Sequence, residues 1–386
     1  DPQKLNKILG QQYHVVVGNP PYITVKDKAL NNAYRDKYPT CHRQYSLGVP
    51  FAERFFDLTL PAQSNVPAGY MGMITANSFM KREFGKKLID EYLSRKELTH
   101  VIDTSGAYIP GHGTPTVILF ARNQQPRIET VRAALGIRGE PGTPDDASQG
   151  KVWRSIVELL PHPGSENEFM SVVDQARSLF SSHPWSIGGG GATELKSAIE
   201  DTSKYRLEEC TSLIGYICMT RADDIYFSTE KSLLRLGIEP QHVIANVEGD
   251  RVRDWEIENP NHTCFPYDKT LNPFMTATVT QYLWPHRTAL WLWLRREPNG
   301  NHREIGLSWY EWSRFQRERF KIPLSITFAE VATHNHFVLD RGGKVFKQTA
   351  PVIKLPADAS EAQHFALLGL LNSSTACFWI KQVFQA

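Results

Sequence analysis

The sequence predicts an α/β protein in which an organised sheet region is followed by a mixed α+β domain. Two observations carry this prediction. Before residue 125, short apolar runs such as Val15–Val17 and Val117–Phe120 alternate with helical patterns. One of these patterns is the face formed by Leu47, Phe51, Phe55 and Leu58. From residue 206 onward the alternation becomes irregular and the predicted strands are short. This change of character indicates at least two structural units.

Composition excludes several classes of protein. A chain of 386 residues is long enough for two or three domains, and no apolar run approaches the roughly 18 residues that a membrane span needs. We therefore expect a soluble, cytoplasmic chain with no membrane partner. It begins at Asp1 rather than at methionine, so we also expect a fragment of a larger protein.

Charge and cysteine usage narrow the classes further. The formal net charge of +2 means that any nucleic-acid contact must come from local basic patches. The cysteines form no C-x-x-C pair, which favours a reducing compartment and predicts no metal site. His334 and His336 alternate along one predicted strand, but no third ligand at a sensible spacing accompanies them. The cysteines are Cys41, Cys210, Cys218, Cys264 and Cys377.

One stretch near the start concentrates the polar chemistry. Val15–Val17 predicts a short buried strand, and Gly18, Asn19, Pro20, Pro21 and Tyr22 must end it abruptly. Proline fixes its own φ and holds the preceding residue extended, so the Asn19 side-chain carbonyl and the Pro20 backbone carbonyl are rigid acceptors. Beside the flat Tyr22 ring, they would hold a planar base that carries an amino group. The alternative is a strand followed by an ordinary proline turn.

The order of these residues resembles motif IV, the Asn-Pro-Pro-Tyr signature of methyltransferases that use S-adenosylmethionine, chiefly those acting on adenine N6 in DNA. The resemblance implies catalytic roles for Asn19, Pro20, Pro21 and Tyr22, stacking of the base on Tyr22, and a cofactor contact from Asn19. Gly69–Phe79 resembles motif VI of the family. The turn Tyr108–Gly113 lies where motif VIII is expected, with Tyr108 as the second stacking candidate and Ile109 or a plain loop as alternatives.

Across the whole length, the sequence is similar to the PglX-type adenine methyltransferases of BREX phage-defence systems and to long restriction-modification methyltransferases. This resemblance implies part of a Rossmann-like methyltransferase sheet followed by a mixed α+β target-recognition domain. Three segments follow: a catalytic half at 1–135 without the glycine-rich cofactor loop, a linker and helical segment at 136–200, and a target-recognition domain at 201–386. Within the second segment we expect helices at Val152–Leu160 and Glu166–Phe180.

Two basic segments are candidates for binding double-stranded DNA. Residues 24–45 read as a polar, irregular, mobile loop containing Lys26, Lys28 and Arg43, although a solvated loop is an equal alternative. Residues 281–321 carry eight basic and four acidic side chains and five tryptophans. The spacing of Trp309, Trp312 and Phe315 indicates a core-facing helix, so the tryptophans are assigned mostly to packing. The phosphate candidates in this second segment are Arg287, Arg295, Arg296, Arg314 and Arg317.

The resemblance implies a site-specific adenine DNA methyltransferase of phage defence or restriction-modification, with S-adenosylmethionine as its cofactor. Other phage-defence proteins and a phage DNA-mimic inhibitor are further candidate partners. Two alternatives remain open. The same elbow serves methyltransferases of a glutamine amide in proteins, although those are compact, whereas about 250 residues follow the motifs here. The chain could also be a DNA-recognition module that transfers nothing, and a labelled-methyl assay would discriminate among the three.

Overall fold

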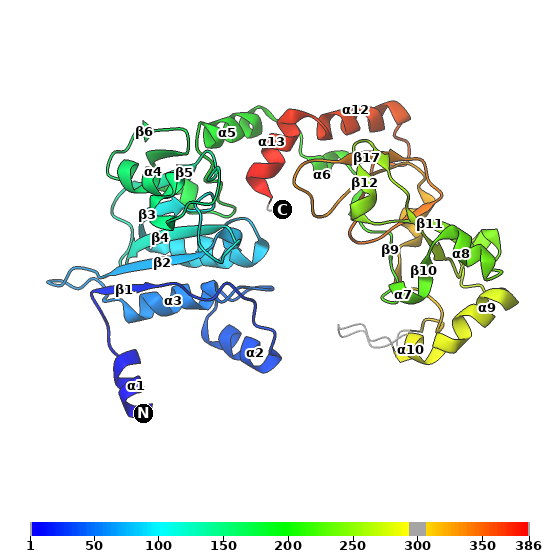
Figure 1. Ribbon diagram of the computed structural model, residues 1–386, viewed down its shortest axis with the longest axis horizontal. Helices are drawn as coiled ribbons and strands as arrows, with labels where there is room; N and C mark the ends of the chain where they lie inside the picture. Colours follow the sequence, from blue (N-terminus) through cyan, green and yellow to red (C-terminus); the bar gives the residue numbers. More distant parts are fainter. Residues whose placement is uncertain (1, 293–305, 385–386) are drawn as a thin grey trace. The chain divides into compact units, whose positions relative to one another are not determined.

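The computed structural model describes residues 2–292 and 306–384, drawn in Figure 1. These residues form two compact units, 2–202 with 381–384 and 203–380. Each unit has its own hydrophobic core.

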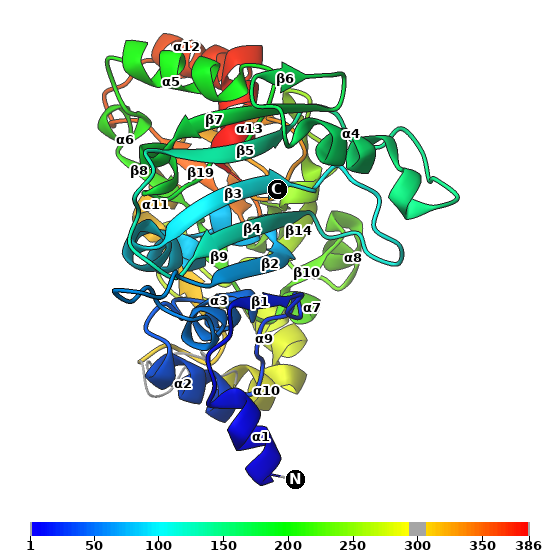
Figure 2. The same cartoon turned by 90° about the vertical axis from the view of Figure 1, so that its left-hand side faces the viewer.

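A seven-stranded mixed sheet organises the first unit, with the strand order β1-β2-β4-β3-β5-β7-β6 (Figure 2). β1 pairs with β2 and β3 with β5 in parallel, and the other neighbours are antiparallel. The helices and strands of this unit are α1 (Pro2–Leu9), β1 (Val15–Gly18), α2 (Lys28–Lys37), α3 (Gly48–Leu58), β2 (Tyr70–Ala76), β3 (Glu97–Asp103), β4 (Thr116–Arg122), β5 (Thr130–Gly136), α4 (Lys151–Leu159), β6 (Ser165–Glu166), β7 (Met170–Ala176) and α5 (Ala192–Thr202), with short helical turns at Asn77–Met80, Glu83–Gly85, Leu88–Tyr92, Leu93–Arg95, Ala147–Gln149 and Arg177–Phe180.

Both faces of this sheet are covered. Successive side chains of a strand point to opposite faces. Val101 of β3 therefore joins the cluster that includes Phe56 of α3, whereas the next residue, Ile102, joins the cluster formed with Val152 and Ile156 of α4. This two-sided burial fixes the register of β3 and β4, because a one-residue slip would exchange the two sets.

The structure corrects three expectations in this unit. The strand at Val15–Val17 is not buried: β1 is an edge strand of the described sheet, and Val15 and Val17 are 60% and 70% exposed. The run of valines predicts a strand, but it does not determine whether other elements pack against that strand and bury its side chains. Residues 24–45 are not an irregular loop, because the Asp27 side chain accepts a hydrogen bond from Leu30 N and caps the helix α2.

The third correction concerns residues 166–180, predicted as a helix. They contain the strand β7, which pairs along its whole length with β5. The β-branched pair Val172 and Val173 suits that position, since β7 lies between β5 and β6 in the sheet. By contrast, the helix expected at Val152–Leu160 forms as α4.

The second unit consists of short strands and helices. Its two four-stranded sheets have the orders β10-β14-β11-β18 and β17-β16-β19-β8, and two further pairs are β12-β13 and β15-β9. The elements are α6 (Leu207–Cys210), β8 (Leu213–Gly215), β9 (Cys218–Met219), α7 (Asp223–Tyr226), β10 (Phe227–Ser228), α8 (Glu230–Arg235), β11 (Val243–Val247), β12 (Val252–Arg253), β13 (Glu256–Ile257), β14 (Asn261–Cys264), α9 (Ala277–Leu283), α10 (Arg287–Leu292), β15 (Arg314–Phe315), α11 (Arg317–Lys321), β16 (Ser325–Phe328), β17 (Phe337–Asp340), β18 (Lys344–Phe346), β19 (Val352–Lys354), α12 (Glu361–Leu371) and α13 (Ser374–Val383), which continues into the first unit.

An aromatic cluster is the centre of the second unit. The Phe265 ring lies 5.4 Å from that of Trp312 and 5.6 Å from that of Phe315, and Tyr267 packs against the same pair. The packing role predicted for Trp312 is thus confirmed, since it is 1% exposed. The predicted helix is wrong: Phe315 belongs to the strand β15, because Arg314 and Phe315 pair with β9.

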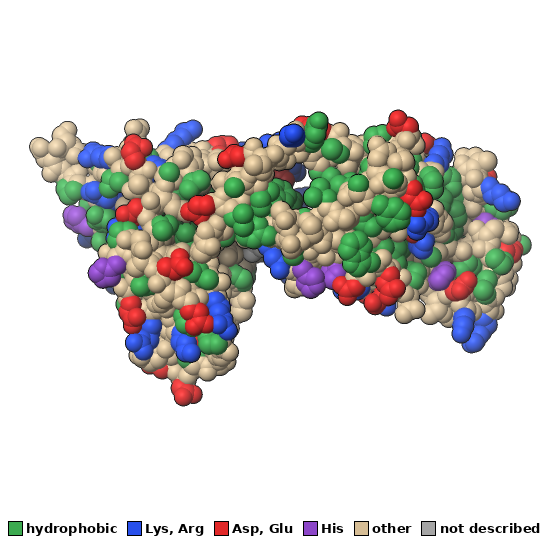
Figure 3. All heavy atoms as spheres, turned by 90° about the horizontal axis from the view of Figure 1, so that it is seen from above, with side chains coloured by type: hydrophobic (Ala, Val, Ile, Leu, Met, Phe, Trp, Pro, Cys, Tyr) green, Lys and Arg blue, Asp and Glu red, His purple; other side chains and the backbone are tan. Residues whose placement is uncertain are grey.

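Two surface properties complete the description. On the face drawn in Figure 3, Lys and Arg side chains are interspersed with Asp and Glu side chains. None of the helices in the described residues is both long and apolar enough to cross a bilayer.

Candidate active site and recognition surface

The Asn19–Tyr22 segment begins where the edge strand β1 ends. Gly18 closes the strand, and Phe55 of α3 packs directly against it, so close that an added Cβ would lie 2.5 Å from Phe55 Cζ. Leu47 N donates to Ile23 O at 2.9 Å, which fixes the chain just beyond the segment to the start of α3. Pro20 is buried while Asn19 is exposed. The elbow is therefore anchored on its proline side and presents the asparagine to solvent.

Asn19 and Tyr22 interact with each other. The Tyr22 hydroxyl donates a hydrogen bond to Asn19 Oδ1 at 2.5 Å. Burial raises the pKa of the Tyr22 phenol, which keeps it protonated and therefore a donor near neutral pH. The bond orients the amide and leaves its second lone pair and its NH2 group available.

The loop between β3 and β4 reaches the same elbow. His112 lies edge-to-face with Tyr22, with ring centroids 4.8 Å apart and an interplanar angle of 89°. Thr114 N donates to His112 Nδ1 at 3.2 Å, which fixes the imidazole in an acceptor role at that nitrogen. Sequence reasoning identified this loop but chose Tyr108, which lies four residues earlier and is half-buried. The stacking role of Tyr108 stays a prediction. Position within the loop was the only signal for His112.

The three basic residues predicted near the elbow occupy the surface of the first unit. Lys26 and Lys28 are exposed, and Lys28 opens α2. Arg43 has a φ of 53° and forms an exposed ion pair with Glu83 at 3.3 Å. A bridge between Thr24 and Ser46 closes the base of the segment that carries all three residues. All three side chains are exposed, and their contacts with a DNA phosphate backbone stay a prediction.

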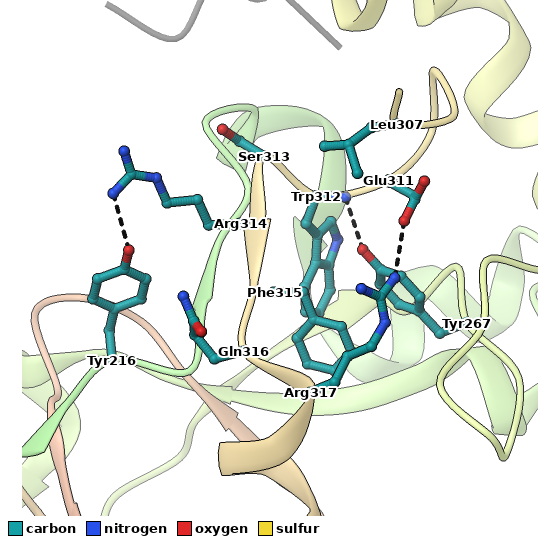
Figure 4. Close-up of a pocket in the computed structure, with 10 residues that line it drawn as sticks. All are labelled: Tyr216, Tyr267, Leu307, Glu311, Trp312, Ser313, Arg314, Phe315, Gln316 and Arg317. Carbon is teal, nitrogen blue, oxygen red and sulfur yellow. Dashed lines mark hydrogen bonds and ion pairs between the residues drawn. The ribbon is translucent and has the colours of Figure 1, made fainter. Parts of the chain in front are cut away.

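Arg314 and Arg317 line one pocket of about 370 Å³ in the second unit (Figure 4). Arg317 is fully engaged: its Nη2 pairs with Glu311 at 3.0 Å, its Nε donates to Leu271 O, and its guanidinium lies over the Tyr267 and Phe315 rings. Arg314 donates to the Tyr216 hydroxyl at 3.1 Å. The two predicted DNA contacts therefore lie together but in different surroundings.

Arg287 is not among the residues that line this pocket. Arg287 opens α10, lies over the Trp284 ring at 4.4 Å and donates to Trp284 O. Arg295 and Arg296 lie outside the described residues.

A metal site receives no support from the part of the chain that is described. No group of three or more His, Cys, Asp or Glu side chains in it is placed to hold a metal ion. The His334 and His336 rings lie 4.3 Å apart, and His336 Nδ1 is 3.2 Å from Asp254 Oδ1.

Comparison with known proteins first defines the class. Residues 3–109 match the sequence model of the family described as Eco57I restriction-modification methylase. Among solved structures, the type IIL restriction-modification enzyme MmeI, determined in complex with DNA, superimposes with a TM-score of 0.56 at 11% identity, covering 93% of this chain and 42% of that one. The mixed α/β fold class predicted from the sequence is confirmed by this likeness.

Particular relatives then follow. The chain is 46% identical over 380 residues to the adenine-specific methyltransferase PglX of Streptomyces coelicolor, covering 96% of this chain and 31% of that protein. It is 24% identical over 262 residues to the type II methyltransferase M.PaeR7I of Pseudomonas aeruginosa, covering 64% of this chain and 40% of the relative. The resemblance inferred from the Asn-Pro-Pro-Tyr motif is thereby confirmed. The chain spans less than half of either relative's length.

Proposed function

We propose that this chain is part of a site-specific DNA methyltransferase that methylates adenine at N6, in restriction-modification or phage defence. The observation that carries the proposal is the elbow itself: an exposed Asn19 side chain at the end of β1, hydrogen-bonded to a half-buried Tyr22. It lies within the segment that matches restriction-modification methylases. Likeness to PglX favours adenine as the base.

The proposed mechanism depends on positioning. The adenine amino group is a poor nucleophile because its lone pair is delocalised into the ring. Asn19 Oδ1 and the Pro20 carbonyl would accept its two N–H groups, favour a more tetrahedral nitrogen and direct its lone pair outward. Asn19 Oδ1 has two lone pairs, so it can accept a hydrogen bond from the Tyr22 hydroxyl and a second one from the amino group of the base. The bond from N6 to carbon would replace the bond from that carbon to the donor's sulfur, which would leave as a neutral thioether. N6 would lose its extra proton to solvent afterwards, so no general base is needed before the bond to carbon forms.

The adenine must leave the duplex to reach this elbow. Extrusion costs a few kcal/mol, and stacking on Tyr22 would offset part of that cost. In the structure without DNA, the His112 ring lies against the Tyr22 ring, so we expect the loop between β3 and β4 to move when a base stacks on Tyr22. Tyr108 in the same loop is the proposed partner on the other side of the base.

S-adenosylmethionine is the proposed methyl donor, and when bound it supplies an electrophilic methyl group on a sulfonium. The amide of Asn19 is exposed just after the end of β1, so it would be available for one contact with such a donor. Among the described residues that precede Asn19, no glycine-rich turn connects a strand to a helix.

Double-stranded DNA is the proposed substrate, with the protein in the cytoplasm. The proposed DNA contacts are Lys26, Lys28 and Arg43 in the first unit and Arg287, Arg295, Arg296, Arg314 and Arg317 in the second part of the chain. The proposed domain division places catalysis in 1–135 and target recognition in 201–386. Other phage-defence proteins and a DNA-mimic inhibitor of phage origin remain candidate partners.

A labelled-methyl assay tests the proposal. The full-length native protein is incubated with S-adenosylmethionine labelled in its methyl group and, in parallel, with duplex DNA and with protein substrates. We expect label in N6-methyladenine of DNA. Label in a protein glutamine would support the alternative amide substrate, and incorporation into neither would refute a transferase. Genomic DNA from cells with and without the intact gene provides the matching observation in vivo.

A further inference from the structure

The strand β15 divides the pocket of the second unit into two sides. In Figure 4, Tyr216, Arg314 and Gln316 lie on one side of the strand, whereas Trp312, Arg317 and Tyr267 lie on the other. Residues i and i+2 of a strand point to the same face, which explains why Arg314 and Gln316 share a side. Hydrogen bonding continues past β15, since Gln316 N donates to Ile217 O at 2.9 Å.

The two sides differ in how far their polar groups are satisfied. On the aromatic side, Arg317 is neutralised by Glu311, which is 5% exposed, and its Nε donates to a backbone carbonyl. On the other side, Arg314 has no ion pair within the described residues, and its one hydrogen bond there goes to the Tyr216 hydroxyl. The Gln316 side-chain amide has no hydrogen-bond partner among the residues that the structure describes. Donors and acceptors are thus presented in the pocket without being used.

The backbone under these two side chains is firmly held. Arg314 pairs with Met219 and Phe315 with Cys218 of β9. Phe315 points into the aromatic cluster, within 4.7 Å of the Tyr267 ring centroid and 5.4 Å of that of Trp312. Arg319 Nη1 donates to Tyr216 O at 2.7 Å and so fixes the residue whose hydroxyl orients Arg314. A supported, rigid strand is what base recognition requires of its side chains.

We propose that Arg314 and Gln316 read the base sequence of the DNA target, with Tyr216 as the residue that positions Arg314. This inference rests on the proposed function and deepens it. Arginine forms a bidentate contact with the O6 and N7 atoms of guanine, and glutamine forms one with N6 and N7 of adenine. Their Cα atoms are about 6.6 Å apart along a strand, close to two base-pair rises of about 3.4 Å. The pair is therefore assigned to a guanine and an adenine within two steps of each other.

A phosphate role fits this side of the pocket less well. A phosphate only accepts hydrogen bonds, so the side-chain oxygen of Gln316 would stay unused against it, whereas the edge of an adenine offers both a donor and an acceptor to the amide. Arg317, the other arginine of the pocket, already has its charge compensated by Glu311. Within the described lining of this pocket, the Arg314 guanidinium has no ion pair, and the Gln316 amide on the same side of the strand can both donate and accept, as a base edge requires.

The test is a binding selection from a randomised duplex pool, performed with the full-length protein and without a methyl donor. Arg314→Lys keeps the charge but loses the guanidinium fork. It is expected to lower the preference for one base pair by roughly 5- to 150-fold, the usual discrimination of a bidentate pair. Affinity for non-specific duplex and its salt dependence should stay unchanged. Gln316→Met should relax a second base pair within two steps, and Tyr216→Phe should weaken preference at the Arg314 base pair alone.

The control is Arg341→Ala, which removes an exposed charge that pairs with Glu361 outside this pocket. It should leave the selected sequence intact. Cooperative thermal unfolding verifies that each variant is folded. If one of Gln316→Met and Arg314→Lys fails to fold, the other variant decides the test. Unchanged sequence preference in both, or an equal loss of affinity for all sequences with a smaller salt slope, would overturn the inference.

The selection separates this inference from the proposed activity. A protein that binds a defined sequence, loses that preference in the two variants and transfers no methyl group would refute the transferase and leave base reading by Arg314 and Gln316 supported. A wild-type protein with no sequence preference would overturn the base-reading inference whatever its methyl-transfer activity.

Discussion

Substitution of Gly18 by alanine tests how the elbow is positioned. The added Cβ would lie 2.5 Å from Cζ and 2.9 Å from Cε2 of Phe55. Non-bonded carbon atoms prefer about 3.5–4.0 Å, so the ring or the strand end must move by about 1 Å. Phe55 also lies edge-to-face against Phe51, with ring centroids 5.9 Å apart, which restricts the retreat of the ring.

The expected cost has two parts. Overpacking of this size destabilises a core by about 1–3 kcal/mol, and the partial exposure of Phe55 favours the low end of that range. If the strand end moves instead of the ring, Asn19 moves with it, and a misplacement of about 1 Å can lower turnover roughly 100-fold. We therefore expect a Gly18→Ala protein that is folded and slightly destabilised but transfers methyl groups far more slowly.

The assay combines thermal unfolding with single-turnover methyl transfer by the full-length protein. Phe55→Leu removes the Cζ and Cε atoms that meet the new methyl group, so the double variant should regain most of the lost activity. Gly142→Ala is the control, because nothing lies within 4 Å of its added Cβ. Wild-type turnover in Gly18→Ala, or no rescue by Phe55→Leu, would refute the reasoning.

Two further predictions follow from single side chains. Tyr22→Phe keeps the ring but loses the bond to Asn19, worth about 1 kcal/mol, so methyl transfer should fall several-fold, whereas Tyr22→Ala also loses about 1–3 kcal/mol of base stacking and should fall much further. Equal losses in single-turnover assays would contradict a stacking role. Burial lowers the pKa of the Lys354 ammonium to about 8. The folded state then binds that proton more weakly than the unfolded state does. Burial of the charged ammonium therefore lowers the free energy of unfolding by its full amount below pH 8, and this loss disappears as the pH rises past the pKa of the lysine in the unfolded chain. Relative to Lys354→Met, the wild type should gain roughly 3 kcal/mol of unfolding free energy over that pH range. Denaturant titrations at several pH values measure this, and the same pH dependence in both proteins would contradict it.

The sequence predicted the parts of the site that depend on local chemistry. The prolines and the β-branched run predict a strand that ends at Asn19, because both effects act through the backbone of a few neighbouring residues. The fold class followed in the same way from alternating patterns. The packing of Trp312 was predicted correctly from a helical spacing, although Phe315 lies in a strand and not in a helix. Likeness to a solved structure confirmed the fold class, and the identity to PglX confirmed the resemblance, whereas the roles of the motif residues stay predictions.

The features that were missed depend on tertiary contacts. The exposure of Val15 and Val17 is set by the place of β1 at the sheet edge, which no run of valines encodes. Residues 170–176 form a strand because β5 offers a partner, and periodicity alone did not separate that strand from a helix. His112 meets Tyr22 only once the loop between β3 and β4 has closed. Asp27 was a readable helix cap that the interpretation of residues 24–45 as a loop overlooked.

The central claim is that the Asn19 side chain holds the amino group that receives the methyl group. Asn19→Ala in the full-length protein removes that acceptor, while the exposed position of Asn19 makes damage to the fold small. Methyl transfer to DNA and equilibrium DNA binding are measured on the same preparation. The account predicts a loss of transfer of at least 100-fold, on the order of the loss from one such contact, with DNA binding largely intact. Turnover at the wild-type rate would contradict it.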